Sequence, residues 1–180
     1  MSKHELRAAA TKLSGITYEQ SLLASTSLDP PVLERIGGSL GFQTLSTLFY
    51  DRVFADASNP WFLGIFATST KDEAIDNQYR FLVQTFGGEE LYTSKKGGKY
   101  GVRLVGRHAN YVIGERAAER WVEHMNCAID EHKALVCDEE AKEYLKMYFR
   151  YTAFYIVVAK EYMRDDQLSG GNQIDSGRVW

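Results

Sequence analysis

The feature that most constrains the fold is an apolar stripe at helical spacing in the second half of the chain. It follows Gly114 and consists of Ala117, Ala118, Trp121, Met125, Ala128 and Ile129. Residues that recur every three or four positions share one face of an α-helix, and an apolar face must be buried. A second stripe runs from Asp138 to about Met163. Two long amphipathic helices in succession are expected to pack antiparallel.

Shorter helices are predicted in the first half of the chain, each followed by glycine or proline. The expected segments are residues 32–36 before Gly37-Gly38, Ser39 to Phe54 before Asn59-Pro60, and Thr70 to Phe86 before Gly87-Gly88. Glycine readily adopts the left-handed conformation that ends a helix, and proline cannot continue one. No segment shows the alternating pattern of a strand, so the predicted class is all-α.

The chain is expected to form one domain flanked by two terminal segments that lie outside its core. Residues 1–30 are expected to form a partly helical, weakly packed extension that ends at Pro30-Pro31. Residues 31–164 form the predicted helical domain, and residues 165–180 a disordered tail. A length of 180 residues with 44% hydrophobic content is sufficient for a single core.

Charge and composition argue against several classes of partner. The net charge of −3 and the lack of a basic block exclude a nucleic-acid footprint. No apolar run is long enough to span a membrane, and the first residues lack the apolar core of a signal peptide. Cys127 and Cys137 form neither a CxxC pair nor a disulfide framework, which favours reduced thiols in the cytoplasm.

Residues 87–107 are predicted to be irregular, because six glycines interrupt them. A loop of this length inside a compact domain is unusual and often functional. His108 stands at its end, outside the helix that carries Trp121, and can approach the interior from another direction. The alternative for a single histidine is a core or surface imidazole that bonds the backbone.

Polar side chains also occupy positions in the apolar stripes. Gln78 lies one turn after Ala74 and one turn before Leu82, where an apolar residue is expected. A buried amide needs hydrogen-bond partners, either in a neighbouring helix or in a ligand. Tyr50 and Trp121 each carry one donor on a large apolar body. Donors from three helices opposite an imidazole suit a haem that binds a diatomic ligand.

The chain resembles a group II truncated haemoglobin, the two-over-two globin, and most resembles its plant-type branch. The matching runs are LFYDRVF around Tyr50, WFLGIF, AIDNQYRFLVQTFGG from Ala74, LYTSKKG, GRHANY and AAERWVEHM. They keep the family order and nearly the family spacing over roughly residues 32–163. The run GGKYGVRLVG before His108 is a few residues longer than in the family, and the extension is a feature of the plant-like branch.

The resemblance implies a globin-like two-over-two helical sandwich that holds haem b. His108 would be the proximal ligand of the iron, and Tyr50, Gln78 and Trp121 would be the distal hydrogen-bonding residues. The imidazole nitrogen that does not bind iron carries an N–H group, which normally donates to a carbonyl or carboxylate; the sequence does not identify that acceptor.

Further contacts to the haem follow from the same resemblance. Phe66 would pack on the porphyrin face, and Ala74 would leave an open path for ligand where many globins carry a distal histidine. Arg107 would pair with a propionate, a contact that suits a guanidinium. Tyr92 is a weaker candidate for the propionate, with loop packing as its alternative.

The implied function is reversible binding of oxygen and of other small ligands such as NO and CO. Buried donors would slow oxygen release, which argues against simple delivery and for redox chemistry on nitric oxide, nitrite or peroxide. The chain has neither a GxGxxG turn nor a P-loop. The reducing electrons would therefore come from an external electron donor.

Two other functions stay open at this point. A haem-based sensor would need a transmitter domain or a structured extension. A haem-free helical interaction module would have no need of His108. His124 and His132 are rival imidazoles on the tryptophan helix, and His4 lies in the extension. A homodimer is also open.

Overall fold

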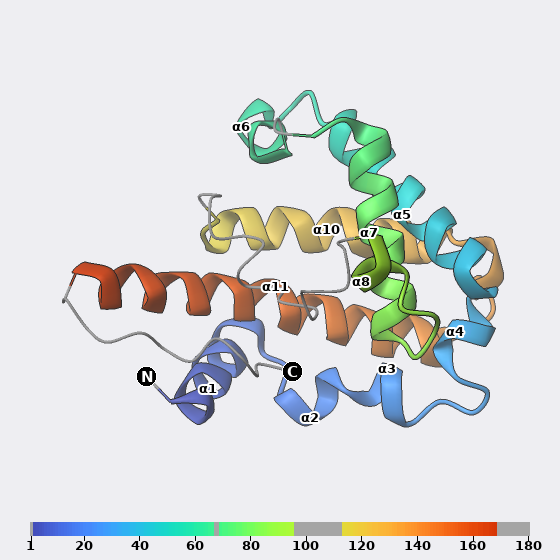
Figure 1. Ribbon diagram of the computed structural model, residues 1–180, viewed down its shortest axis with the longest axis horizontal. Coiled ribbons are helices and arrows are strands. Elements are labelled where there is room, and N and C mark those ends of the chain that lie inside the picture. Colours follow the sequence, from blue (N-terminus) through green and yellow to red (C-terminus); the bar gives the residue numbers. More distant parts are fainter. Residues whose placement is uncertain (1, 67–68, 96–112, 169–180) are drawn as a thin grey trace.

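The computed structural model describes residues 2–66, 69–95 and 113–168, with side chains to residue 162. In chain order its elements are α1 (Lys3–Ser14), α2 (Tyr18–Ser21), α3 (Leu23–Thr26), α4 (Val32–Arg35), α5 (Gly38–Phe54), α6 (Pro60–Leu63), η1 (Gly64–Phe66), α7 (Lys71–Thr85), α8 (Leu91–Lys95), α10 (Glu115–Glu131), η2 (Lys133–Leu135) and α11 (Glu139–Leu168) (Figure 1). No strand occurs in these ranges, and the predicted all-α class is confirmed.

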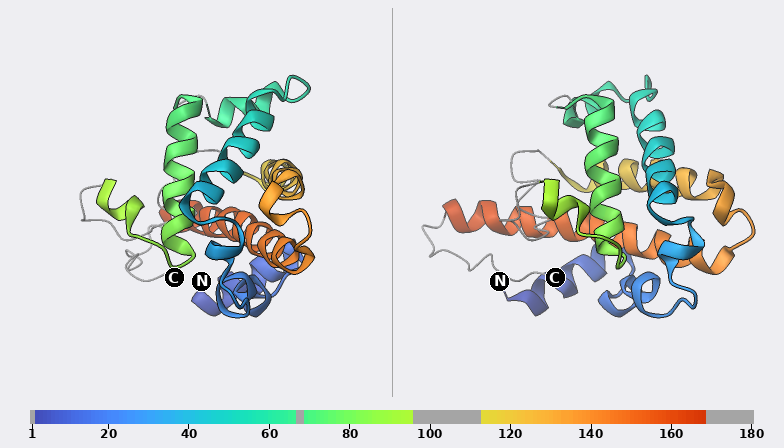
Figure 2. Two further views of the ribbon diagram at one scale, coloured as in Figure 1. Left: turned by 90° about the vertical axis from the view of Figure 1, so that its right-hand side faces the viewer. Right: turned by 45° about the vertical axis from the view of Figure 1, so that its right-hand side comes forward.

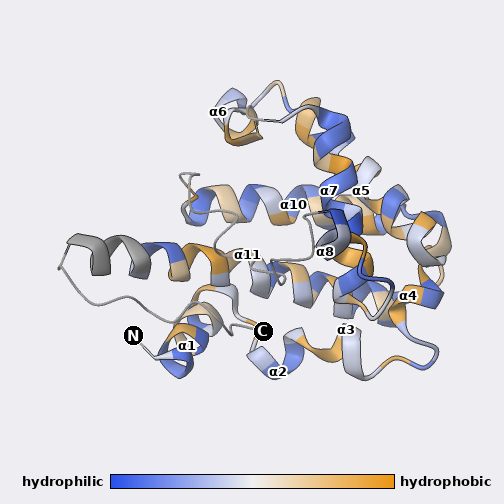
Figure 3. Ribbon diagram, viewed as in Figure 1, coloured by the Kyte–Doolittle hydropathy of each residue, from blue (hydrophilic) through white to orange (hydrophobic). Residues whose placement is uncertain are grey.

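The two long helices α10 and α11 run side by side, joined by the short η2 (Figure 1). Between them, the ring centroids of Trp121 and Phe149 are 5.7 Å apart. The Nη1 atom of Arg150 donates to Glu119 at 2.9 Å. The earlier residue of α10 thus contacts the later residue of α11. The helices are therefore antiparallel, as predicted. Along α10, apolar positions recur turn by turn between polar ones (Figure 3).

A second pair, α5 and α7, lies across the first (Figure 2). Phe42 of α5 and Phe86 at the end of α7 stack with their centroids 5.2 Å apart. Phe49 of α5 reaches Trp121 of α10, at a centroid separation of 4.9 Å. Two helices packed across two others form the expected two-over-two sandwich, and the rings between the pairs fill its core.

Local signals place the ends of the second pair. Thr70 caps α7, because its side chain accepts from the Glu73 backbone N–H while the Glu73 side chain accepts from the Thr70 backbone N–H. Gly37, with φ 98°, precedes α5, and Gly87, with φ 86°, follows α7. Both glycines hold a left-handed conformation that other residues rarely adopt. These boundaries match the predicted ones.

The N-terminal extension packs more closely than predicted. Helices α1–α3 lie on the side of α11 away from α10 (Figures 1 and 2). Ala10 is fully buried against Tyr151 and Tyr155 of α11, and Arg150 Nε donates to the carbonyl oxygen of Ser14 at 2.7 Å. The prediction of a weakly packed segment is therefore wrong. The contacts that hold the extension join residues far apart in the sequence, and such contacts leave no local pattern from which they could be predicted.

Two other segments differ from expectation. Leu91–Lys95 form α8 within a stretch predicted to be irregular. The side chain of Gln84 on α7 fixes this helix, with Oε1 accepting from the Thr93 backbone N–H at 3.0 Å and Nε2 donating to the Thr93 hydroxyl at 2.7 Å. Helix α11 extends to Leu168, beyond its predicted end near Met163. No helix among the described residues has the length and apolar content needed to cross a membrane.

Candidate functional site

A cavity lies among α5, α7, α10 and α11, where the two helix pairs cross. Its volume is about 410 Å³, within the range of roughly 300–1,000 Å³ typical of small-molecule sites. Apolar residues make up much of its lining, including Ile65, Phe81, Leu82, Ala118, Phe149 and Ile156. A cavity of this kind favours a largely apolar ligand held in orientation by a few polar groups.

Tyr50, Gln78 and Trp121 all line this cavity, from α5, α7 and α10 respectively. Tyr50 is only 8% exposed, and its ring lies 5.9 Å from that of Phe66. Trp121 is held between Phe49 and Phe149. The Oε1 atom of Gln78 is buried, and no residue that the structure describes bonds it. The structure thus brings together the three residues that the sequence selects as distal groups.

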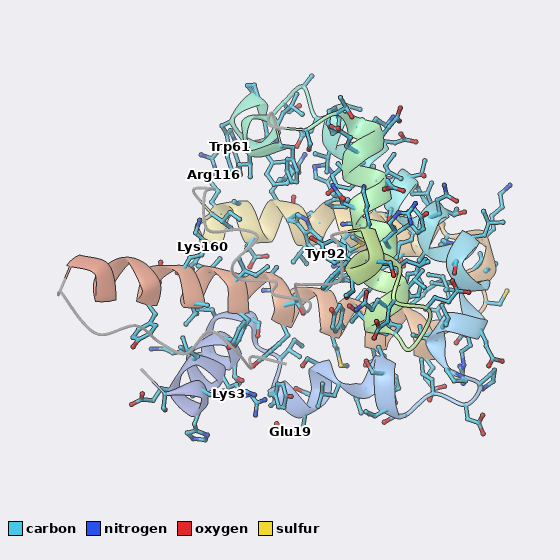
Figure 4. The ribbon with its side chains drawn as sticks, in the orientation of Figure 1. Lys3, Glu19, Trp61, Tyr92, Arg116 and Lys160 are labelled. Carbon is cyan, nitrogen blue, oxygen red and sulfur yellow. The ribbon has the colours of Figure 1, made fainter. Side chains whose placement is uncertain are left out.

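Phe66, Ala74 and Tyr92 also line the cavity. Phe66 ends η1, and Ala74 leaves its position on α7 without a bulky side chain. Tyr92 lies on α8 beside α7 (Figure 4) and packs edge-on against Phe81 at 6.0 Å. Its position is compatible both with loop packing and with contact to a bound group.

His108 and Arg107 lie outside the described residues. The other three histidines do not line the cavity. His124 Nε2 is 3.0 Å from a carboxylate oxygen of Asp56, and His132 Nε2 is 3.0 Å from the carbonyl oxygen of Gly41. His4 is exposed on α1. The side chains of His124 and His132 are thus bonded to other groups, and that of His4 lies at the surface, so none of the three faces the cavity.

Comparison with known proteins identifies the family. A family model for bacterial-like globins matches residues 31–155. The chain belongs to the bacterial-like globin family. This globin is 38% identical over 159 residues to two-on-two hemoglobin-3 of Arabidopsis thaliana, covering 87% of this chain and 83% of that protein. It is also 38% identical over 156 residues to group 2 truncated hemoglobin 3-1 of Lotus japonicus, covering 87% of each chain. These similarities confirm the group II plant-type resemblance.

Solved structures agree with this assignment. A thermostable hemoglobin from Thermobifida fusca superposes with a TM-score of 0.61 at 29% identity, covering 70% of this chain and 95% of the other. A hemoglobin from Chloroflexus aurantiacus superposes with a TM-score of 0.58 at 34% identity, covering 68% of this chain and 93% of the other. A truncated hemoglobin from Pseudoalteromonas haloplanktis, 23% identical, shares the fold with a TM-score of 0.60 and covers 70% and 96% of the two chains.

Membership of a globin family implies a haem cofactor and small gaseous ligands such as oxygen. The cavity fits such a group. Its apolar walls suit the faces of a porphyrin, and the buried Oε1 atom of Gln78 supplies a polar group that no described residue satisfies. A bound haem would fill the apolar cavity, and a polar ligand on the haem would give the Gln78 side chain a hydrogen-bond partner.

Sequence reasoning missed two polar features near the cavity. Thr152 of α11 lines the cavity, and its buried hydroxyl has no partner among the described residues. A polar residue within an apolar stripe, the signal that selected Gln78, could have found it. The buried carboxylate of Asp56 was also missed, and no local pattern marks it.

Proposed function

We propose that this globin holds one haem b in the cavity, with His108 as the axial iron ligand. It would bind oxygen and retain it tightly, and would also take NO and CO. The observation that carries the proposal is the buried Oε1 atom of Gln78, which no described residue bonds, in an apolar cavity that Tyr50 and Trp121 also line. A buried amide oxygen left without a hydrogen bond costs roughly 1–3 kcal/mol, and a polar ligand in the cavity would offset that cost.

When bound, haem supplies an iron centre that takes up a diatomic ligand and exchanges electrons. The chain's own residues decide how such a ligand is held. The Tyr50 hydroxyl and the Trp121 indole N–H are donors, and rotation of the Gln78 amide would bring its NH2 group to the position of Oε1. Each donor to a charged or strongly polar group contributes roughly 1–3 kcal/mol, equivalent to about tenfold to hundredfold slower release.

The remaining residues would hold and frame the haem. Phe66 would pack on its face, while Ala74 would leave a path for the ligand. Arg107 would pair with a propionate through its guanidinium, and Tyr92, on the cavity wall, is a second candidate for that contact.

We also propose redox chemistry on nitric oxide, nitrite or peroxide. Tight retention of oxygen serves reaction at the site better than delivery. Because the chain carries no dinucleotide or P-loop motif, the electrons would come from an external electron donor. Turnover of nitric oxide under oxygen, with and without an added reductant, tests this part of the proposal.

The axial role of His108 is tested by His108→Ala. This variant should lose tight haem binding and regain part of it when imidazole is added. His4→Ala, which removes an exposed histidine from α1, is the matched control and should bind haem normally. A normal haem spectrum in His108→Ala without added imidazole would contradict the assignment.

A further inference from the structure

Asp56 is a buried carboxylate in the turn between α5 and α6. Its side chain is only 2% exposed, and carboxylates are rarely buried unless they are paired. Its Oδ2 atom accepts from Arg120 Nε at 2.7 Å and from His124 Nε2 at 3.0 Å, and its Oδ1 atom accepts from Asn59 Nδ2 at 3.2 Å. The bond from Arg120 holds the pKa of this carboxyl well below its usual range, so it is ionised.

These contacts join two parts of the molecule. Asp56, Asn59, Arg120 and His124 form what we call the Asp56 cluster. Trp61 of α6 donates through Nε1 to the cluster's Asn59 at 3.1 Å. The guanidinium carbon of Arg116 lies 4.2 Å from the centroid of the Trp61 ring, and Figure 4 shows the two side chains on facing elements. The α5–α6 turn and α6 are therefore tied to α10 by charge and by a cation–π contact.

The cluster also contacts residues of the cavity wall. The His124 ring stacks on Phe62, with centroids 5.6 Å apart and planes inclined by 30°. Phe62 in turn lies 5.3 Å from Phe66, and both line the cavity. On α10, Trp121 directly follows Arg120. The cluster thus touches the wall formed by α6 and η1 on one side and the wall that carries Trp121 on the other.

We propose that Asp56 is a positioning residue for the ligand site. By holding Arg120 and His124, it fixes the register of α10 against the α6–η1 segment. It thereby sets the distance between the Trp121 donor and the ligand position that Phe66 and Tyr50 face. This inference rests on the proposed function, because it concerns how strongly a ligand in that cavity is retained.

The physical reason is the short range of a hydrogen bond. N–H···O bonds have donor–acceptor distances of about 2.7–3.2 Å, and they weaken steeply when the N–H···O angle falls below about 120°. A small shift of α10 would therefore remove the indole contact without opening the core. Loss of the shared acceptor on Asp56 would release both Arg120 and His124 from the α5–α6 turn at once, whereas loss of an exposed ion pair would not move α10.

The test compares Asp56→Asn with Asp130→Asn. The first change keeps the side-chain shape but removes the buried charge. The second removes an exposed carboxylate of α10 that pairs with Lys146. Both variants and the wild type are first titrated with haemin, and the C–O stretching band of their carbonyl complexes is then recorded. We expect one-to-one binding in all three, a shifted or split band only in Asp56→Asn, and oxygen release about tenfold faster in that variant.

A double-mutant cycle separates positioning from general destabilisation. If Asp56 acts through Trp121, Asp56→Asn should change oxygen release less than twofold in a Trp121→Phe background. Independent, multiplicative effects would overturn the proposal, as would an unchanged band and release rate in the single variant. Should Asp56→Asn fail to fold, Arg120→Gln removes the ion pair between α10 and the same carboxylate from a partly exposed position, leaves the His124 bond in place, and must show the same dependence on Trp121. Absence of haemin uptake by the wild type would instead refute the proposed function on which this inference rests.

Discussion

His132 and Gly41 are joined by a hydrogen bond across the two helix pairs, with Nε2 3.0 Å from the carbonyl oxygen although the residues are 91 positions apart. A carbonyl only accepts, so Nε2 carries the proton. The other ring nitrogen, Nδ1, is buried without a partner among the described residues. Burial therefore lowers the pKa of His132 below its ordinary value of 6.5.

This bond predicts a pH dependence of stability. The unfolded chain takes up a proton on His132 before the folded protein does, because the folded pKa is lower. The contribution to stability is present above pH 6.5 and is lost as the pH falls below that value. We expect the free energy of unfolding, measured in urea, to fall more steeply with acidification in wild type than in His132→Gln. Parallel slopes in the two proteins would contradict this account.

Gly41→Ala should be strongly destabilising. A Cβ atom at this position would lie 1.9 Å from the carbonyl oxygen of Ile36, so the backbone of α4 or α5 would have to move. We expect a loss of about 3 kcal/mol or more in the free energy of unfolding. Gly64→Ala is the matched control, since a Cβ atom on Gly64 would meet nothing within 4 Å, and it should change stability by less than about 1 kcal/mol. Equal effects of the two substitutions would contradict the close approach.

Tyr151→Phe should leave the stability unchanged or raise it by about 1 kcal/mol. Tyr151 is fully buried between α11 and the extension, and its hydroxyl has no hydrogen-bond partner among the described residues. Burial raises the pKa of the phenol to about 12, so the group is neutral near pH 7 and its removal costs no charge interaction. A thermal melt that showed a loss beyond about 1 kcal/mol would reveal a hydroxyl contact.

Trp121→Phe separates hydrogen bonding from bulk in the cavity. The substitution keeps an aromatic ring beside Phe49 and Phe149 but removes the indole N–H. We expect oxygen release to become about tenfold faster and carbon monoxide release to change little, because oxygen gains more from a donor. Stopped-flow ligand replacement measures both rates. Equal acceleration of the two ligands would show that the indole acts only by filling space.

Much of the fold could be predicted because its signals are local. The Thr70 cap, the glycines that flank α5 and α7, and the stripe of α10 all act within a few residues of the helix they define. Three residues of the cavity wall could be predicted for a related reason. Tyr50, Gln78 and Trp121 carry hydrogen-bonding groups in or beside stripes of apolar residues.

The remaining features depend on contacts between distant parts of the chain. Asp56 and Arg120 are 64 positions apart, and Arg150 reaches Ser14 across 136 positions. Neither pair leaves a pattern in its own segment, so a buried carboxylate and a packed extension could not be predicted. The helix α8 likewise depends on a side chain of α7, the Gln84 amide that bonds Thr93.

The most direct test of the central claim is an optical titration of the purified protein with haemin, followed by reduction under carbon monoxide. The cavity and its polar lining predict a sharp endpoint at one haem per chain, and the proposed axial role of His108 predicts a carbonyl spectrum of the histidine-ligated type. Absence of saturable binding would contradict the account, and Tyr50, Gln78 and Trp121 would then be core residues of a haem-free bundle.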